Sequence, residues 1–103
     1  MLRAFIFACG ALLSAGAQAQ SFPCRYAAAD DELAICASDT LSRLDERMAG
    51  LYADLRRTLG GLALARLEVT QQDWLARRGR CHDNAACIAS VYRARIDELT
   101  NWD

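Results

Sequence analysis

One stretch of the sequence decides the fold: Gln71 to Cys87, which reads QQDWLARRGRCHDNAAC. Its first half places Gln71, Trp74 and Arg78 one helical turn apart, which is typical of a helix with one face toward a core. Gly79 suits a helix end, and two cysteines then bracket a short loop before another helix begins. We expect the rest of the chain to pack around this corner.

The chain starts with a pattern typical of a secretory signal peptide. Met1-Leu2-Arg3 is a positive start, residues 4–15 are apolar and uncharged, and Ala17-Gln18-Ala19 is a small-x-small cleavage site. The apolar run is shorter than the roughly 20 residues of a membrane helix. We therefore predict residues 1–19 to be a cleaved leader and residues 20–103 to be one domain, periplasmic or secreted, with no transmembrane anchor.

Cys9 offers a second interpretation, because Ile6-Phe7-Ala8-Cys9 loosely resembles a lipidation signal. This cysteine comes very early, and the bulky Phe7 stands where a small residue is usual. We favour an apolar leader residue that is discarded.

Removing 19 of the 103 residues leaves 84, which is a small domain with a modest core. Such domains usually need a covalent or metal staple. Four cysteines remain, an even number that favours disulfides in an oxidising compartment. With Arg3 removed, 11 basic residues face 13 acidic ones, a charge of −2. This balance gives no basic footprint for nucleic acid.

The apolar pattern predicts four helices and no strands. A short helix starts at the acids of residues 30–32, after an extended opening segment over residues 21–26. The longer helices are expected over residues 39–59, 62–78 and 84–99. The first of them is marked by apolar residues three and four apart: Leu41, Leu44, Met48, Leu51 and Leu55. The predicted fold class is all-α, a small disulfide-stapled bundle of three main helices, up-down-up, with a short N-terminal helix over one end.

Four cysteines allow three connectivities, and sequence alone does not choose among them. In the predicted bundle, Cys81 and Cys87 flank one tight corner, while Cys24 and Cys36 belong to the N-terminal segment. Local pairing within each set requires the least rearrangement, so we favour it. A zinc site is the alternative use of Cys-x5-Cys with His82 between, but the spacing is unusual and the chain has one histidine. We expect no metal and no cofactor.

Polar residues interrupt the apolar faces of the predicted helices. Gln71, Arg78 and Arg95 lie on such faces, and Asp45 flanks another. A buried arginine without a partner is costly, so these residues either form an internal network with Asp45 as acceptor or leave a face open to a partner. We favour the internal network.

No constellation of residues indicates an enzyme. The only histidine stands in a tight loop without a nucleophile elbow or reactive-cysteine signature, and a helical domain of this size offers little depth for a substrate cleft.

Taken together, the motifs resemble a family named after the lysozyme inhibitor LprI. The resemblance covers residues 22–99 and rests on an ordered set of patterns. These are Phe22-x-Cys24, Ile35-Cys36, Leu41-x-x-Leu44-Asp45-x-x-Met48-x-x-x-Tyr52-x-x-Leu55, Gln71-x-x-Trp74-Leu75-x-x-Arg78-x-x-Cys81 and Cys87-Ile88-x-x-x-Tyr92-x-x-Arg95-Ile96-x-x-Leu99. The resemblance implies a small, exported, disulfide-stapled helical domain of bacterial envelopes, with a protein partner such as lysozyme.

A lysozyme cleft holds two carboxylates, so an inhibitor benefits from a rigid cationic donor. Arg80 and His82 lie on the loop between the second pair of cysteines and are our hypothesis for the contact. The plainer interpretation is that Arg80 is a helix C-terminal charge and His82 a solvent-facing loop residue. A non-inhibitory envelope interaction module that binds another exported protein is the alternative function.

Overall fold

The computed structural model describes residues 21–103. They form a short 3-10 helix, η1 (Cys24–Tyr26), and four α-helices: α2 (Asp30–Ala37), α3 (Asp39–Thr58), α4 (Gly61–Gly79) and α5 (Ala85–Thr100). No strand occurs among these residues, which confirms the all-α fold class. The predicted leader and Cys9 lie outside the described part of the chain.

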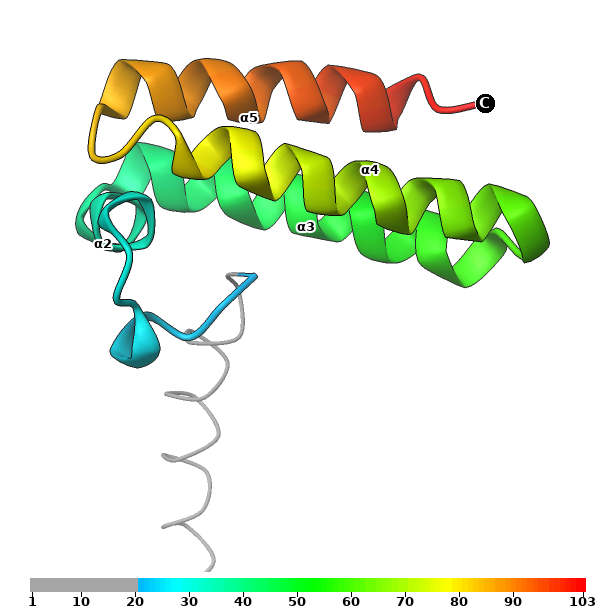
Figure 1. Ribbon diagram of the computed structural model, residues 1–103, viewed down its shortest axis with the longest axis horizontal. Coiled ribbons are helices and arrows are strands. Elements are labelled where there is room, and N and C mark those ends of the chain that lie inside the picture. Colours follow the sequence, from blue (N-terminus) through cyan, green and yellow to red (C-terminus); the bar gives the residue numbers. More distant parts are fainter. Residues whose placement is uncertain (1–20) are drawn as a thin grey trace, which may run out of the picture.

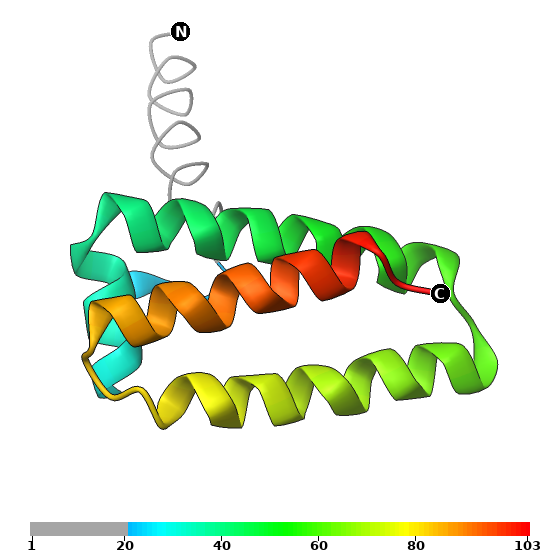
Figure 2. The ribbon, with the colours of Figure 1, turned by 90° about the horizontal axis from the view of Figure 1, so that it is seen from above.

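The three long helices run side by side, with α5 lying over the gap between α3 and α4 (Figure 1, Figure 2). α5 packs most extensively on α3 and less on α4, whereas the backbones of α3 and α4 diverge. α2 crosses one end of the bundle and contacts all three long helices. This is the predicted arrangement of three main helices with a short helix over one end.

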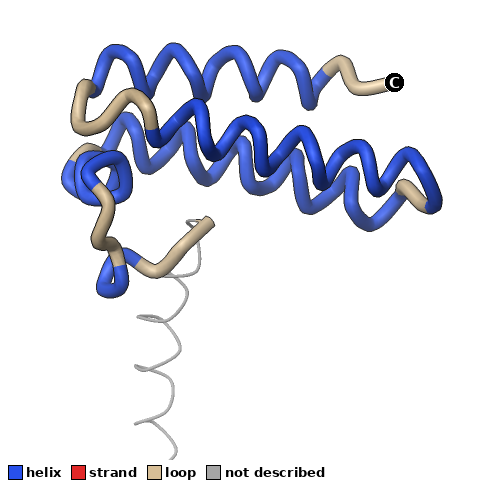
Figure 3. The backbone as a smooth tube through the Cα atoms, viewed as in Figure 1, coloured by secondary structure: helices blue, strands red, loops and turns tan. Residues whose placement is uncertain are grey.

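Local side-chain chemistry explains where α3 and α5 start. Ser38 precedes α3, and its hydroxyl accepts the backbone N–H of Leu41 at 3.2 Å. Asn84 precedes α5, and its side-chain oxygen accepts the N–H of Cys87 at 3.0 Å. Both are ordinary N-caps that satisfy a free donor of the first turn. The loops that join the long helices are short, as the tube in Figure 3 shows.

The opening segment differs from the extended conformation that we predicted. The N–H of Tyr26 donates to the carbonyl of Pro23 at 3.0 Å, which closes the turn of η1. Pro23 disfavours helix for the residue before it, but its own φ of −74° also suits the start of a helical turn. The same proline therefore ends the extended stretch and begins η1.

The core lies where α5 covers α3 and α4 and where α2 closes the end. Its centre is an edge-to-face pair of Trp74 and Tyr92, with ring centroids 5.0 Å apart. The indole N–H of Trp74 donates to the carbonyl of Val91 at 3.0 Å, so the ring is buried without an unsatisfied donor. The buried apolar residues are Ile35, Leu41, Met48, Leu67, Trp74, Cys81, Ile88, Ala89, Tyr92, Ile96 and Leu99.

Both predicted disulfides are confirmed. Cys24 pairs with Cys36, which ties η1 to α2, and Cys81 pairs with Cys87, which closes the corner between α4 and α5. Each bridge joins neighbouring elements, so neither bridge alone holds the three long helices together.

Replacing each cysteine pair by serine, in two separate variants, should lower the free energy of unfolding by roughly 2 to 3 kcal/mol in each case. Loop-closure entropy varies only with the logarithm of ring size, so the two losses should be similar although the separations are 12 and 6 residues. Urea denaturation measures both. A loss near zero for the Cys81–Cys87 variant would mean that non-covalent contacts alone fix that corner.

Candidate functional site

The corner between α4 and α5 carries the two side chains predicted to contact a partner. Arg80 caps the C-terminus of α4, and its backbone N–H donates to the carbonyls of Ala76 and Arg77, both at 3.2 Å. His82 follows Cys81, which is buried at 5% exposure. Arg80 and His82 are both exposed, so the loop is anchored in the core at Cys81 and presents a basic side chain on each side of the anchor.

The backbone of this loop is restrained from within. The N–H groups of His82 and Asn84 donate to the carbonyls of Gly79 and Cys81, both at 3.1 Å, and the disulfide closes the ring. His82 itself has a φ of 54°, in the left-handed region that an L-residue adopts at a cost of about 1–2 kcal/mol. Strained backbone of this kind persists only where the surroundings hold it, and it often marks functional sites.

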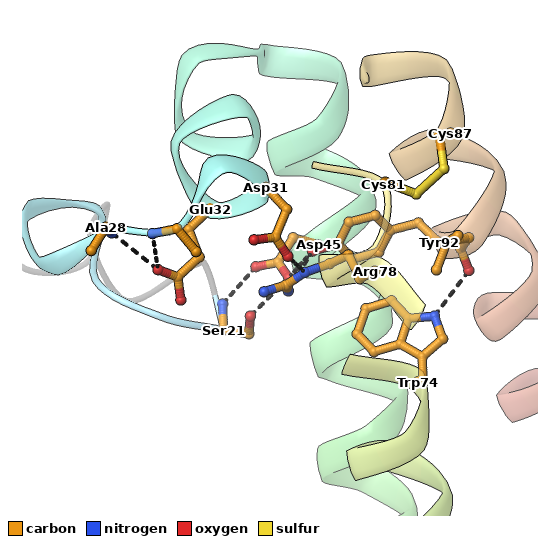
Figure 4. A network of polar contacts seen from close by, with 12 residues as sticks. Ser21, Ala28, Asp31, Glu32, Asp45, Trp74, Arg78, Cys81, Cys87 and Tyr92 are labelled. Atoms are coloured by element: carbon orange, nitrogen blue, oxygen red, sulfur yellow. Dashed lines mark hydrogen bonds and ion pairs between the residues drawn. A yellow bond between two sulfur atoms is a disulfide. The ribbon is translucent and has the colours of Figure 1, made fainter. Parts of the chain in front are cut away.

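Directly behind the corner, Arg78 forms a buried ion pair with Asp31 of α2. The guanidinium Nε lies 2.7 Å from Oδ2, and each side chain is 6% exposed. Nη1 donates to the hydroxyl of Tyr92 at 3.2 Å, and the guanidinium stacks 5.5 Å from the centre of the Phe22 ring. Arg78 thus joins α2, α4 and α5 at one point (Figure 4).

Asp45 lies deeper in this network and is fully buried. Its Oδ1 accepts the hydroxyl of Tyr92 at 2.7 Å and that of Ser21 at 2.8 Å, and its Oδ2 accepts the backbone N–H of Ser21 at 2.7 Å. The prediction that Asp45 accepts an arginine is wrong: within residues 21–103, Arg78 pairs with Asp31, and Asp45 receives neutral donors. The hydroxyl of Tyr92 bridges Arg78 and Asp45, because it accepts from the guanidinium and donates to the carboxylate.

The other two predicted network members, Gln71 and Arg95, form a second cluster further along the bundle. Arg95 Nε donates to Gln71 Oε1 at 3.1 Å, Nη2 donates to the Thr70 hydroxyl at 3.2 Å, and Nη1 pairs with Glu98 at 2.6 Å. The amide of Gln71 contacts the sulfur of Met48 at 3.5 Å, from α4 across to α3. In the described chain no hydrogen bond joins this cluster to Asp45, so the four predicted residues belong to two clusters.

Burial and neighbouring charge control protonation in the first cluster. Burial raises the pKa of the Tyr92 phenol far above its ordinary value, the Asp45 carboxylate raises it further, and the Arg78 guanidinium partly opposes this. Burial lowers the pKa of Arg78, but Tyr92 and Asp31 together outweigh that effect, so the net shift is upward. Tyr92 therefore stays a neutral donor beside a permanently charged guanidinium.

Asp31 is the site residue that the sequence analysis missed. It is one of three consecutive acids, which the sequence pattern explains equally well as charges at a helix N-terminus. Only Asp31 stands four residues from the buried Ile35, on the inner face of α2. Asp30 is exposed, and Glu32 accepts the N–H of Ala28 at 3.1 Å. The spacing from Ile35 was the available signal.

The sequence indicates less about the other two residues of this network, Tyr92 and Ser21. Helical spacing predicts a core position for Tyr92, which is correct, but spacing does not reveal where its hydroxyl points. Ser21 lies outside every helix, and nothing in its neighbourhood indicates a contact with Asp45.

Comparison with known proteins identifies the family. The sequence model of the family Lysozyme inhibitor LprI matches residues 24–99, from η1 almost to the end of α5. The chain belongs to this family. Neither a curated protein nor a solved structure matches the chain. The matched range includes both disulfides and the Asp31–Arg78 pair, and the family of inhibitors that it represents implies a protein partner.

Two further findings describe the chemistry of this LprI-family domain. Within residues 21–103, no group of three or more His, Cys, Asp or Glu side chains is placed to hold a metal ion. None of the helices in that range has both the length and the apolar character needed to cross a membrane. What the corner offers is a set of hydrogen-bond donors on a restrained loop, which is suited to recognising an anionic surface.

Replacing Asp31 with Ala should lower the free energy of unfolding by about 3–5 kcal/mol, because Arg78 would remain buried without its carboxylate. Asp30→Ala is the matched control, since Asp30 is exposed, and it should change stability by less than about 0.5 kcal/mol. Thermal or urea unfolding of both variants checks this. Equal losses for the two would contradict a special role for the Asp31–Arg78 pair.

The stability of the domain should fall at alkaline pH because of Tyr92. Folding raises the pKa of Tyr92, so the buried phenol contributes its full share of stability below the ordinary tyrosine pKa of about 10. Above that pH only the unfolded chain gives up the proton, so this share of the stability is lost as pH rises. The slope should reach about −1.4 kcal/mol per pH unit.

Free energies of unfolding between pH 8 and about pH 11.5 test this sign. Tyr92→Phe should start from a lower stability and lack this part of the alkaline decline. A parallel decline in both proteins would contradict the assignment.

Proposed function

We propose that this protein is an exported inhibitor of lysozyme and that it contacts the enzyme through the loop between Cys81 and Cys87. The observation that carries the proposal is the match of the LprI inhibitor family over residues 24–99. The two disulfides agree with an oxidising location such as the periplasm or the extracellular space.

The chemistry of the loop supports this contact. Lysozymes cleave glycosidic bonds with a pair of carboxyl groups in their cleft. A guanidinium can donate two parallel hydrogen bonds to a carboxylate, and a neutral imidazole can donate one. Arg80 and His82 supply these donors from an exposed position, although Asp83 in the same loop adds an opposing charge.

The support behind the loop lowers the entropic cost of binding. The disulfide, the backbone hydrogen bonds and the buried Arg78 restrict the loop before any partner arrives. A preorganised donor loses less conformational freedom on association than a mobile one. The left-handed backbone at His82 is consistent with this role, because the fold retains a side chain there where glycine would be easier.

The deciding experiment measures lysis of a peptidoglycan suspension by c-type, g-type and i-type lysozymes, with and without the oxidised protein at micromolar concentration. We expect dose-dependent inhibition of one type. Arg80→Ala should weaken it by about tenfold to a hundredfold, the range for losing a charged hydrogen bond. Arg57→Ala is the control: Arg57 is an exposed arginine at the opposite end of the bundle, paired with Asp54, and its loss should leave inhibition unchanged.

His82→Gly separates binding from folding. Glycine removes the imidazole but relieves the left-handed strain, so the free energy of unfolding should rise by up to about 1 kcal/mol while inhibition weakens. Weaker inhibition by a more stable protein cannot result from unfolding. Inhibition that survives changes at both residues would move the contact to a helix face, and no inhibition of any type would overturn the function.

A second candidate is the non-inhibitory interaction module. The observation in its favour is the exposure of apolar side chains on α4, with Leu62 at 89% and Val69 at 60%. Such a module would need no basic loop.

A further inference from the structure

α4 carries a second face that nothing within the described chain covers. Every residue of this outer stripe is exposed, and their spacing alternates between three and four. The members are Leu62, Ala65, Val69, Gln72 and Ala76. The stripe contains no charge over four helical turns, in a protein of which 24% of the residues are charged.

This outer stripe lies on the side of α4 opposite its core face. The core face consists of Leu67, Gln71, Trp74 and Arg78, all buried. A helix that needed only to cover this core would be polar on its other side. The spacing of the outer stripe is instead that of a coiled-coil seam, which buries such residues against another helix.

We propose that the outer stripe pairs with the same stripe of a second copy, as two antiparallel α4 helices about a two-fold axis. In the register that we infer, Val69 lies opposite Gln72 of the second copy, and Ala65 lies opposite Ala76. The exposed Leu62 then lies over Gly79 of the second copy. The space where a side chain of Gly79 would stand is open in the monomer, which leaves room for the leucine.

Charges beside the stripe select this orientation. Arg66 and Asp73 are exposed and flank the seam on the same side. In the antiparallel register, Arg66 meets Asp73 of the second copy, and symmetry repeats the pair. A parallel pairing would instead set Glu68 against Asp73 of the second copy, two like charges.

The surface beside the seam is hollowed. A hollow of about 400 Å³ lies between α3 and α4, and Ala65, Val69 and Gln72 of the stripe line it. Pairing of this kind places the two Cys81–Cys87 loops at opposite ends of the dimer, and the proposal does not depend on the function of the loop.

Sedimentation equilibrium of the oxidised protein tests the proposal, from about 10 μM to about 1 mM, a range suited to a weak interface. The dimer fraction should rise with concentration. Val69→Glu places a charge in the seam and should weaken association by at least about tenfold. Ala53→Glu, the same kind of change on the exposed side of α3, should have no effect. Circular dichroism melting shows that each variant is folded.

Charge reversal tests the register. Arg66→Asp and Asp73→Arg should each weaken the dimer, and the double variant should restore it, because opposite charges then meet again. A protein that is monomeric at every concentration overturns the proposal. So does association that is insensitive to Val69→Glu, or a double variant as weak as the single ones. None of these results bears on lysozyme inhibition, which is measured separately.

Discussion

The structure depends on the burial of one guanidinium. Arg78 lies on the inner face of α4, where a charge without a partner would be very costly. Asp31 reaches it only because α2 lies across the end of the bundle, and Tyr92 reaches it only from α5. The position of the short helix and the packing of the last helix are therefore conditions for the burial of a single side chain.

This dependence separates the parts of the fold that sequence could predict from those that it could not. Alternating spacings of three and four predicted α3 closely, over residues 39–59 against the observed Asp39–Thr58, and the expected start of α5 at residue 84 lies one residue from the observed Ala85. A short segment of sequence determines each of these features, so each can be predicted without knowing how the helices pack. The pairing of the cysteines was predictable for the same reason, since each bridge joins adjacent elements.

The partner of Arg78 was not predictable in that way. The sequence contains many acids, and which of them meets the arginine depends on how α2 crosses the bundle, which no local pattern encodes. The prediction chose Asp45, whose carboxylate lies on the other side of the Tyr92 hydroxyl. Polar positions on apolar helix faces indicated which side chains are buried. Which of these side chains bond to one another depends on how the helices pack, and the sequence pattern does not show that.

Two arginines two residues apart have different environments at the corner between α4 and α5. Arg78 is withdrawn into the core, and Arg80 stands in solvent at the end of the same helix. The buried arginine sets the direction in which the chain leaves α4. The core therefore fixes the orientation of the helix end that carries the exposed Arg80.

The covalent and non-covalent links of this fold also operate over very different lengths of chain. The disulfides close rings between cysteines 12 and 6 positions apart, whereas Asp31 meets Arg78, and Asp45 meets Tyr92, across 47 positions. Each ring can close as soon as its own short stretch is available, before distant segments have met. Oxidation can thus precede assembly, and the correct disulfide pattern in a preparation does not by itself report that the helices have reached their native order.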